Sequence, residues 1–236
     1  MIGGEYKVRP ITGDEFDVIY TRSSATVKGC LSRFRRLFEN SDVEWVAGLD
    51  VEYTTVLGRE KDLKDEERKK PAVIQVCVHD LCLVYHICHA DVECLDFKNF
   101  LESNLVKFVT VDFTNDKEVL GRIGFVVGNP FDLQKNRLLP SGQPSMLTLA
   151  GAMVHPSYGN LEKPPCTFHC HAWQRKRTRY RPHTLHCNGW LPLFQYLQGL
   201  DEEQEPSVRF KQRSMGQEEE GQGRSRGRGR GLRVRW

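Results

Sequence analysis

Two carboxylates, Asp50 and Glu52, stand close together in this 236-residue chain. They follow the apolar run 46–49, which predicts a buried strand. Because strand side chains alternate between faces, both carboxylates point the same way, roughly 6–7 Å apart along the backbone. Like charges at this separation repel each other unless a cation lies between them, and hard oxygen ligands suit Mg²⁺ or Mn²⁺. The pair therefore predicts a metal site of the kind found in two-metal hydrolytic centres.

The elements around this pair predict an α/β fold. Apolar runs indicate strands, which we expect at residues 6–10, 17–21, 46–52, 72–78, 81–86, 107–111 and 125–127. Apolar residues at helical spacing indicate helices, which we expect at residues 27–38, 97–101, 114–120, 146–153 and 191–200. Thr114 and Asn115 are the expected cap of the third helix. Antiparallel strands followed by strand–helix alternation are typical of a mixed sheet with helices on both faces.

The composition predicts one soluble globular domain, with 39% hydrophobic and 28% charged residues. The apolar stretches are shorter than a membrane span, and the first residues lack the features of a signal peptide. We therefore expect a protein that is not secreted, has no membrane partner and resides in the nucleus, the cytoplasm or both. The eight cysteines are expected to be reduced thiols.

A disordered tail is expected at residues 201–236, after a folded domain at residues 5–200. Its first part is acidic, whereas residues 224–236 alternate arginine with glycine in part. Neither part has an apolar periodicity, which predicts disorder. The Arg/Gly run resembles tails that bind RNA loosely through phosphates. The alternative is a solubilising segment, neutralised by its own acidic neighbour.

A set of motifs in chain order resembles the Werner-type 3′–5′ exonuclease domain of the DEDD superfamily. The motifs are residues 48–52, 71–77, 97–101, 108–111 with Asp116, 131–133 and 145–150. The strands expected at residues 6–10 and 17–21 flank a polar turn and predict an N-terminal β-hairpin. This hairpin and the Arg/Gly tail are similar to those of compact plant members of the family. The resemblance implies a ribonuclease-H-like mixed five-stranded sheet with helices on both faces, plus an N-terminal hairpin. It also implies hydrolysis at the 3′ ends of DNA or RNA.

The resemblance assigns metal-binding roles to three carboxylates. Asp50 would bind both metals, Glu52 would bind the metal that activates water, and Asp116 would reach the second metal. The implied cofactor is a pair of Mg²⁺ or Mn²⁺ ions. From the residues alone, Asp116 has another explanation, because a negative charge near a helix N-terminus is favoured by the helix dipole.

Two departures from the family pattern bear on catalysis. Where the family has Val-Gly-Val-Gly, residues 109–112 read Val-Thr-Val-Asp, so that Asp112 either crowds the metals or turns outward. Asn188 stands where the fourth aspartate belongs, and no tyrosine precedes it at the family spacing; His186 or His183 could orient the water instead. The alternative function is therefore a catalytically inactive relative that binds nucleic acid or acts as a scaffold.

A second metal pattern is formed by Cys166, Cys170, His183 and Cys187, whose spacing is close to that of a C2HC zinc finger. A zinc-dependent binding module is thus a third possibility. Against it, Pro182 directly precedes the histidine in what would be a helix interior. We expect Mg²⁺ or Mn²⁺ rather than Zn²⁺.

A basic segment with aromatic residues lies within the same region. Its candidate nucleic-acid contacts are Trp173, Arg175, Lys176, Arg177, Arg179 and Tyr180. Cations could hold phosphates while aromatic rings stack on bases. The alternatives are a solvated basic loop, and packing of Trp173 in the core.

Overall fold

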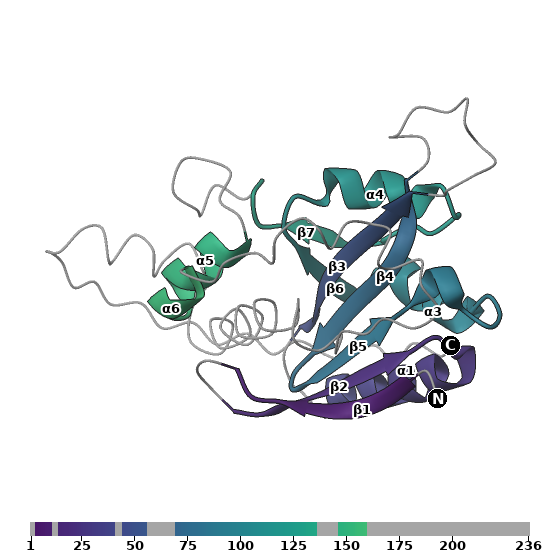
Figure 1. The fold of residues 1–236 in the computed structure, drawn as a ribbon, viewed down its shortest axis with the longest axis horizontal. Coiled ribbons are helices and arrows are strands. Elements are labelled where there is room, and N and C mark those ends of the chain that lie inside the picture. The colour runs from purple at the N-terminus through teal and green to yellow at the C-terminus, as the bar shows by residue number, and fades with distance from the viewer. Residues whose placement is uncertain (1–2, 11–13, 41–43, 56–68, 136–145, 160–236) are drawn as a thin grey trace, which may run out of the picture.

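The structure is a computed structural model that describes residues 3–10, 14–40, 44–55, 69–135 and 146–159. The described strands form a seven-stranded sheet in the order β1-β2-β5-β4-β3-β6-β7 (Figure 1). The strands are β1 (Gly3–Val8), β2 (Phe16–Thr21), β3 (Trp45–Thr55), β4 (Lys69–Val78), β5 (Leu81–Tyr85), β6 (Val106–Thr110) and β7 (Pro130–Asp132). The helices are α1 (Ser24–Glu39), η1 (Ile87–His89), α3 (Leu95–Glu102), α4 (Phe113–Gly121), α5 (Met146–Met153) and α6 (Pro156–Gly159).

The sheet is mixed, and this confirms the predicted α/β fold. Strands β3, β4 and β5 pair antiparallel, whereas β6 and β7 continue the sheet in parallel with β3. Five strands in one mixed sheet are what the resemblance implies, although the last of them lies at other residues than expected. The N-terminal hairpin joins the same sheet, because β2 pairs in parallel with β5. The hairpin thus extends the predicted five strands to seven.

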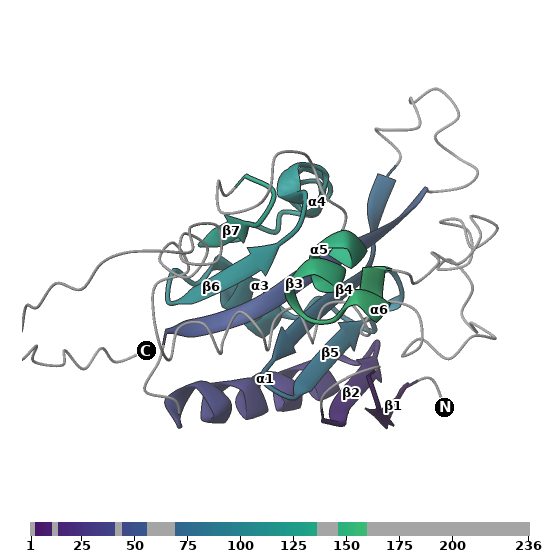
Figure 2. The same ribbon diagram turned by 90° about the vertical axis from the view of Figure 1, so that its left-hand side faces the viewer.

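Helices cover both faces of the sheet, as predicted. On one face, Ala47, Leu49 and Val51 of β3 pack in a cluster with residues of α1 and α3, such as Phe34 and Phe97. On the other face, Val46 of the same strand packs in a cluster with Leu149 of α5. Figure 2 shows α5 and α6 lying over that second face. The two-residue alternation of β3 therefore decides which side chains reach which layer.

The prediction of a strand at residues 125–127 is wrong, since β7 begins at Pro130. Phe125 is buried in the core, and Val126 is exposed. The chain crosses the end of α3 here: the Gly128 N–H donates to the Leu101 carbonyl, and a Cβ at Gly128 would lie 2.3 Å from the Glu102 oxygen. Because the chain passes so close to α3 at Gly128, its pairing with β6 begins only at Pro130. Proline at the first position of β7 fits a site where no N–H is needed.

The predicted cap of α4 is also wrong. Thr114 and Asn115 lie in the first turn, and Asp112 precedes the helix. The helix starts earlier because a distant carboxylate accepts its first N–H groups, as described below. Beyond these corrections, the predicted helix at residues 191–200 and the tail lie outside the described residues. None of the helices in the described ranges is long and apolar enough to cross a membrane.

Candidate active site

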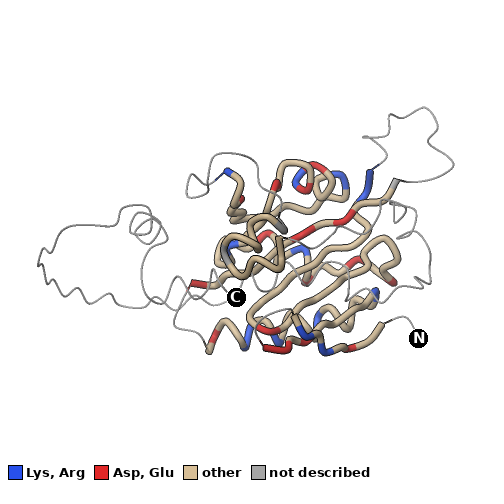
Figure 3. The backbone as a smooth tube through the Cα atoms, turned by 60° about the vertical axis from the view of Figure 1, so that its left-hand side comes forward, with Lys and Arg blue, Asp and Glu red and all other residues tan. Residues whose placement is uncertain are grey.

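Asp50 and Glu52 lie near the C-terminal end of β3, on the same face of the sheet. They are half-buried and pair with Gln75 and Val73 of β4, just before a register shift between Glu52 and Tyr53. Because Leu49 and Val51 face the core under α1 and α3, the two carboxylates face the opposite side. Figure 3 shows acidic residues on β3 close to those of α4.

Asp116 of α4 is the third carboxylate, and it is only 5% exposed. Burial raises the pKa of Asp116 to about 8, and the charges of Asp50, Glu52 and Asp112 add to this effect. A hydrogen bond with the Tyr53 side chain acts in the opposite direction on the same pKa. Burial also raises the pKa of Tyr53, with the charge of Asp116 as the next cause. The phenol therefore stays protonated and donates to Asp116. The fold thus brings together three carboxylates that the sequence analysis singled out.

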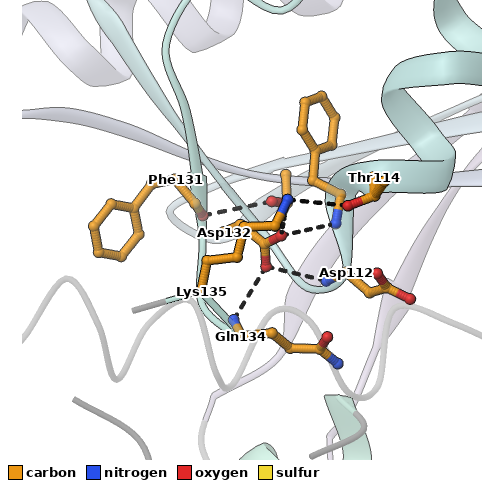
Figure 4. A network of polar contacts seen from close by, with 8 residues as sticks. Asp112, Thr114, Phe131, Asp132, Gln134 and Lys135 are labelled. Atoms are coloured by element: carbon orange, nitrogen blue, oxygen red, sulfur yellow. Dashed lines mark hydrogen bonds and ion pairs between the residues drawn. The ribbon is translucent and has the colours of Figure 1, made fainter. Parts of the chain in front are cut away.

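Asp132, the last residue of β7, fixes the start of the helix that carries Asp116. Its Oδ1 accepts the backbone N–H groups of Asp112 and Gln134, both at 3.1 Å, and its Oδ2 accepts that of Phe113 at 3.1 Å (Figure 4). Lys135 lies 3.4 Å from this carboxylate. The first N–H groups of a helix have no acceptor within the helix. Asp132 accepts two of them, those of Asp112 and Phe113. These bonds fix the start of α4, and with it Asp116, relative to the end of β7.

Asp112 turns outward, which answers one question left open by the sequence. The residue is exposed and adopts a left-handed conformation, with φ 57° and ψ 54°. In Figure 4 its carboxylate points away from Asp132. Its charge still contributes to the raised pKa of Asp116. Asp112 therefore adds negative potential to the site from its rim.

Two positioning residues, Gln75 and Tyr53, were missed by the sequence analysis. The Gln75 side-chain amide donates to Asp50 Oδ2 at 3.1 Å, and Gln75 itself is 5% exposed. A polar residue inside the apolar run of β4 was the available signal, because a buried amide needs a partner. For Tyr53, the sequence carries no comparable signal, since its contact with Asp116 depends on the placement of α4.

The donor set fits a divalent cation of the Mg²⁺ or Mn²⁺ class. The three carboxylates supply only hard oxygen ligands, which these ions prefer. Burial, and after it the charges of Asp50 and Glu52, raise the pKa of Asp116, and a bound cation would offset both effects. Asp50, Glu52 and Asp116 are the residues that would hold such an ion.

The remaining predicted site residues lie outside the described residues. They are Asn188, His186 and His183 of the third motif, Cys166, Cys170 and Cys187 of the zinc pattern, and Trp173, Arg175, Lys176, Arg177, Arg179 and Tyr180 of the basic segment. Their roles stay predictions.

No protein-family model matches the chain, and no curated protein matches it. Solved structures do share its fold. The EXO domain of Nibbler from Aedes aegypti aligns with a TM-score of 0.54 at 12% identity, over 87% of this chain and 98% of that one. RNase D from Trypanosoma brucei, in complex with GMP, aligns with a TM-score of 0.55 at 15% identity, over 83% of this chain and 62% of that one.

RNase D from Escherichia coli, described as an exoribonuclease involved in structured RNA processing, gives a TM-score of 0.55 at 12% identity over 81% of this chain. The chain spans 62% and 44% of the lengths of the two RNase D chains. At these identities the likeness concerns the fold, and it agrees with the resemblance seen in the motifs. The chain therefore shares the α/β fold of these exonuclease structures, which is the ribonuclease-H-like fold.

Proposed function

We propose that this chain is a metal-dependent 3′–5′ exonuclease, which hydrolyses the terminal phosphodiester bond at the 3′ end of a nucleic acid. One observation carries the proposal: β3 and α4 bring Asp50, Glu52 and Asp116 together on an exonuclease fold. A carboxylate cluster of this kind is costly to bury without a cation. The cluster is therefore better explained by a metal-binding function than by the stability of the fold.

In this proposal the three carboxylates hold Mg²⁺ or Mn²⁺, which would supply charge stabilisation and an activated water. The other residues hold the carboxylates in place. Gln75 donates to Asp50, which fixes the orientation of that carboxylate. Tyr53 donates to Asp116. Asp132 accepts N–H groups at the start of α4 and so keeps Asp116 in position. Such outer contacts are needed because small displacements of catalytic groups slow the reaction.

RNA is the first substrate to test, because the proteins of similar fold include E. coli RNase D, described as an exoribonuclease. DNA of the same sequence is the second arm of the test. The basic segment at residues 173–181 and the Arg/Gly tail are proposed as further contacts with the nucleic acid. We also propose that the protein acts in the nucleus, the cytoplasm or both.

The second candidate function is a catalytically inactive relative that still binds nucleic acid. Asn188 favours it, because a neutral amide replaces the carboxylate that the family has at this position. A weaker ligand there would reduce activity in either case. Restoring the carboxylate with Asn188→Asp separates the two functions.

The test uses a 5′-labelled single-stranded RNA with Mg²⁺ or Mn²⁺. We expect products that shorten one nucleotide at a time from the 3′ end, and loss of these products in Asp50→Asn. Asp112→Asn is the matched control, since it removes an exposed carboxylate at the rim, and asparagine tolerates the left-handed conformation. Products that persist in Asp50→Asn would exclude this site. Activity that appears only in Asn188→Asp would support the inactive relative.

A further inference from the structure

Three residues with metal-binding side chains lie together at the end of β5, away from the carboxylates. His86 follows the strand directly, and Cys88 and His89 belong to η1. Each offers one ligand atom, and these atoms all lie within 4.8 Å of one another. The backbone holds this turn closed, because the His89 N–H donates to the His86 carbonyl at 3.1 Å. The His86 N–H in turn donates to the Thr21 carbonyl at 2.8 Å, which ties the turn to β2.

One ring nitrogen of His89, Nε2, is buried and has no hydrogen-bond partner among the described residues. A buried polar atom without a partner costs free energy on the order of 1–3 kcal/mol. The imidazole rings of His86 and His89 lie edge to face, with their centroids 4.7 Å apart. One ring nitrogen of each histidine and the sulfur of the exposed Cys88 lie within 4.8 Å of one another.

His86 also has the outer contact that metal-ligating histidines use. Its Nδ1 lies 2.5 Å from the hydroxyl of Tyr20, in a buried hydrogen bond. When Nδ1–H donates to the phenol oxygen, the lone pair of the imidazole is on Nε2. A hydrogen bond of this type fixes the ring orientation and the tautomer of a ligating histidine.

We propose that His86, Cys88 and His89 bind one transition-metal ion of the Zn²⁺ class. Two imidazoles and one thiolate suit Zn²⁺, and they are poor ligands for Mg²⁺. Neighbouring ligand atoms in a tetrahedral zinc site are roughly 3.3–3.8 Å apart, from the usual metal–ligand distances. The cluster therefore needs movements on the order of 1 Å, and the exposed Cys88 side chain can supply the largest of them. Three protein ligands leave the fourth position to water.

Binding would release a proton from Cys88. A cysteine thiol ordinarily has a pKa of about 8.5. Before binding, Cys88 thus carries its S–H hydrogen at neutral pH. The S–H bond breaks as the metal–sulfur bond forms, and the proton passes to solvent.

This site differs from the carboxylate site in place and in chemistry. Strands β3 and β5 both pair antiparallel with β4, so that they end at the same edge of the sheet. Glu52 faces Val73 of β4, and Tyr85 faces the next residue, Ile74. His86 is thus about two strand spacings, roughly 10 Å, from Glu52. The inference does not depend on the proposed exonuclease function.

The test is a titration of the metal-free, full-length protein with Co²⁺, a spectroscopic substitute for Zn²⁺, in excess Mg²⁺. The thiolate-to-cobalt absorption band arises only where sulfur binds Co²⁺, and the excess Mg²⁺ competes for any site built from oxygen ligands. We expect one equivalent of Co²⁺ to produce the band, and Zn²⁺ to remove it. Cys88→Ser should abolish the band. His89→Gln and Tyr20→Phe should each raise the half-saturating Co²⁺ concentration at least about 10-fold.

The double variant Cys166→Ser, Cys170→Ser is the matched control, because it disrupts the other cysteine pattern in the chain and should retain the band. Circular dichroism checks that each variant is folded; serine at the exposed Cys88 is a mild change. The proposal is overturned if the wild-type protein shows no band. It is equally overturned if the band survives Cys88→Ser, or if the double variant loses it while Cys88→Ser does not.

Discussion

Burial and neighbouring negative charges both raise the pKa of Asp116. Its side chain is buried beside Asp50 and Glu52, and it belongs to a helix that begins at the edge of the sheet. Without a cation, the folded protein favours the protonated form of this carboxyl group far more than the unfolded chain does. Under the proposed function, a divalent ion bound at this site would offset the cost of ionising Asp116 in the folded protein.

The substitution Asp116→Asn should stabilise the metal-free protein at pH 8 and abolish nuclease activity. The pKa of Asp116 is raised from its ordinary value of 3.8 to about 8. Its stabilising proton is thus fully present below about pH 4 and is lost as the pH rises through 8. At pH 8 we expect an increase in the free energy of unfolding on the order of 2 kcal/mol, and little difference at pH 4.

Urea denaturation in a chelator at both pH values measures this difference. Excess Mg²⁺ provides the control, because it should stabilise the wild-type protein and leave Asp116→Asn nearly unchanged. A difference between the two proteins that is the same at pH 4 and pH 8 would contradict the role given to this carboxyl group.

Tyr53→Phe should weaken metal binding without unfolding the protein. The change removes the hydroxyl that donates to Asp116, so the pKa of Asp116 should rise further. We expect the half-saturating Mn²⁺ concentration to increase about 10-fold, as for other outer contacts of metal ligands. Calorimetric titration measures it. Tyr85→Phe, which removes a buried hydroxyl in the core, serves as control and should leave Mn²⁺ binding unchanged; equal losses in both variants would rule out a specific contact.

At the scale of elements, α4 depends on a carboxylate that lies in another strand. Asp132→Ala removes the acceptor of the Asp112 and Phe113 N–H groups. We expect a loss of about 1–3 kcal/mol in the free energy of unfolding, together with reduced activity because Asp116 loses its fixed position. Thermal or urea denaturation and the RNA assay measure the two effects.

Asp112→Gly is the matched control for this prediction. It changes the adjacent cap residue, but glycine adopts a left-handed conformation without the steric cost that aspartate bears. This variant should keep or slightly raise stability. If Asp112→Gly were as destabilising as Asp132→Ala, the Asp112 side chain rather than the Asp132 contact would hold the helix.

The elements also show where the sequence suffices and where it does not. Apolar periodicity predicted α1, α3 and strands β3 to β6, because burial on one or both faces decides these patterns. It failed at β7, where the close crossing of Gly128 over α3 shifts the pairing to Pro130. It failed again at the start of α4, because Asp132 caps the helix from a distance of twenty residues along the chain. Contacts between distant residues leave little local signal.

At the scale of the whole molecule, the order of the motifs predicted the fold, and the hairpin showed the limit of that prediction. Strand β2 joins the sheet by pairing in parallel with β5, and parallel pairing between distant segments has no sequence signature of its own. For the candidate site, the resemblance pointed to Asp50, Glu52 and Asp116, whose side chains the fold brings close together. Gln75 and Tyr53 were not, because their roles depend on the register of β4 and the placement of α4.

The Arg/Gly tail should contribute to nucleic-acid affinity through charge alone. Replacing its arginines by glutamine should weaken RNA binding and flatten its salt dependence, with the logarithmic slope reduced by up to about 4 for single strands. The residues to replace are Arg224, Arg226, Arg228, Arg230, Arg233 and Arg235. Fluorescence anisotropy at several salt concentrations measures the slope. Lysine at the same positions is the control, and an unchanged slope in the glutamine variant would mean that the tail does not contact RNA.

The most direct test of the proposed function is the rate at which the full-length protein releases the 3′-terminal nucleotide from a 3′-labelled RNA in Mn²⁺. The carboxylate site predicts measurable release that chelation stops and that Asp50→Asn lowers by at least about 1,000-fold, equivalent to roughly 4 kcal/mol of transition-state stabilisation. Asp112→Asn should retain most of the rate. Release that is equal in the wild-type protein and Asp50→Asn, or that continues in chelator, would contradict the proposal.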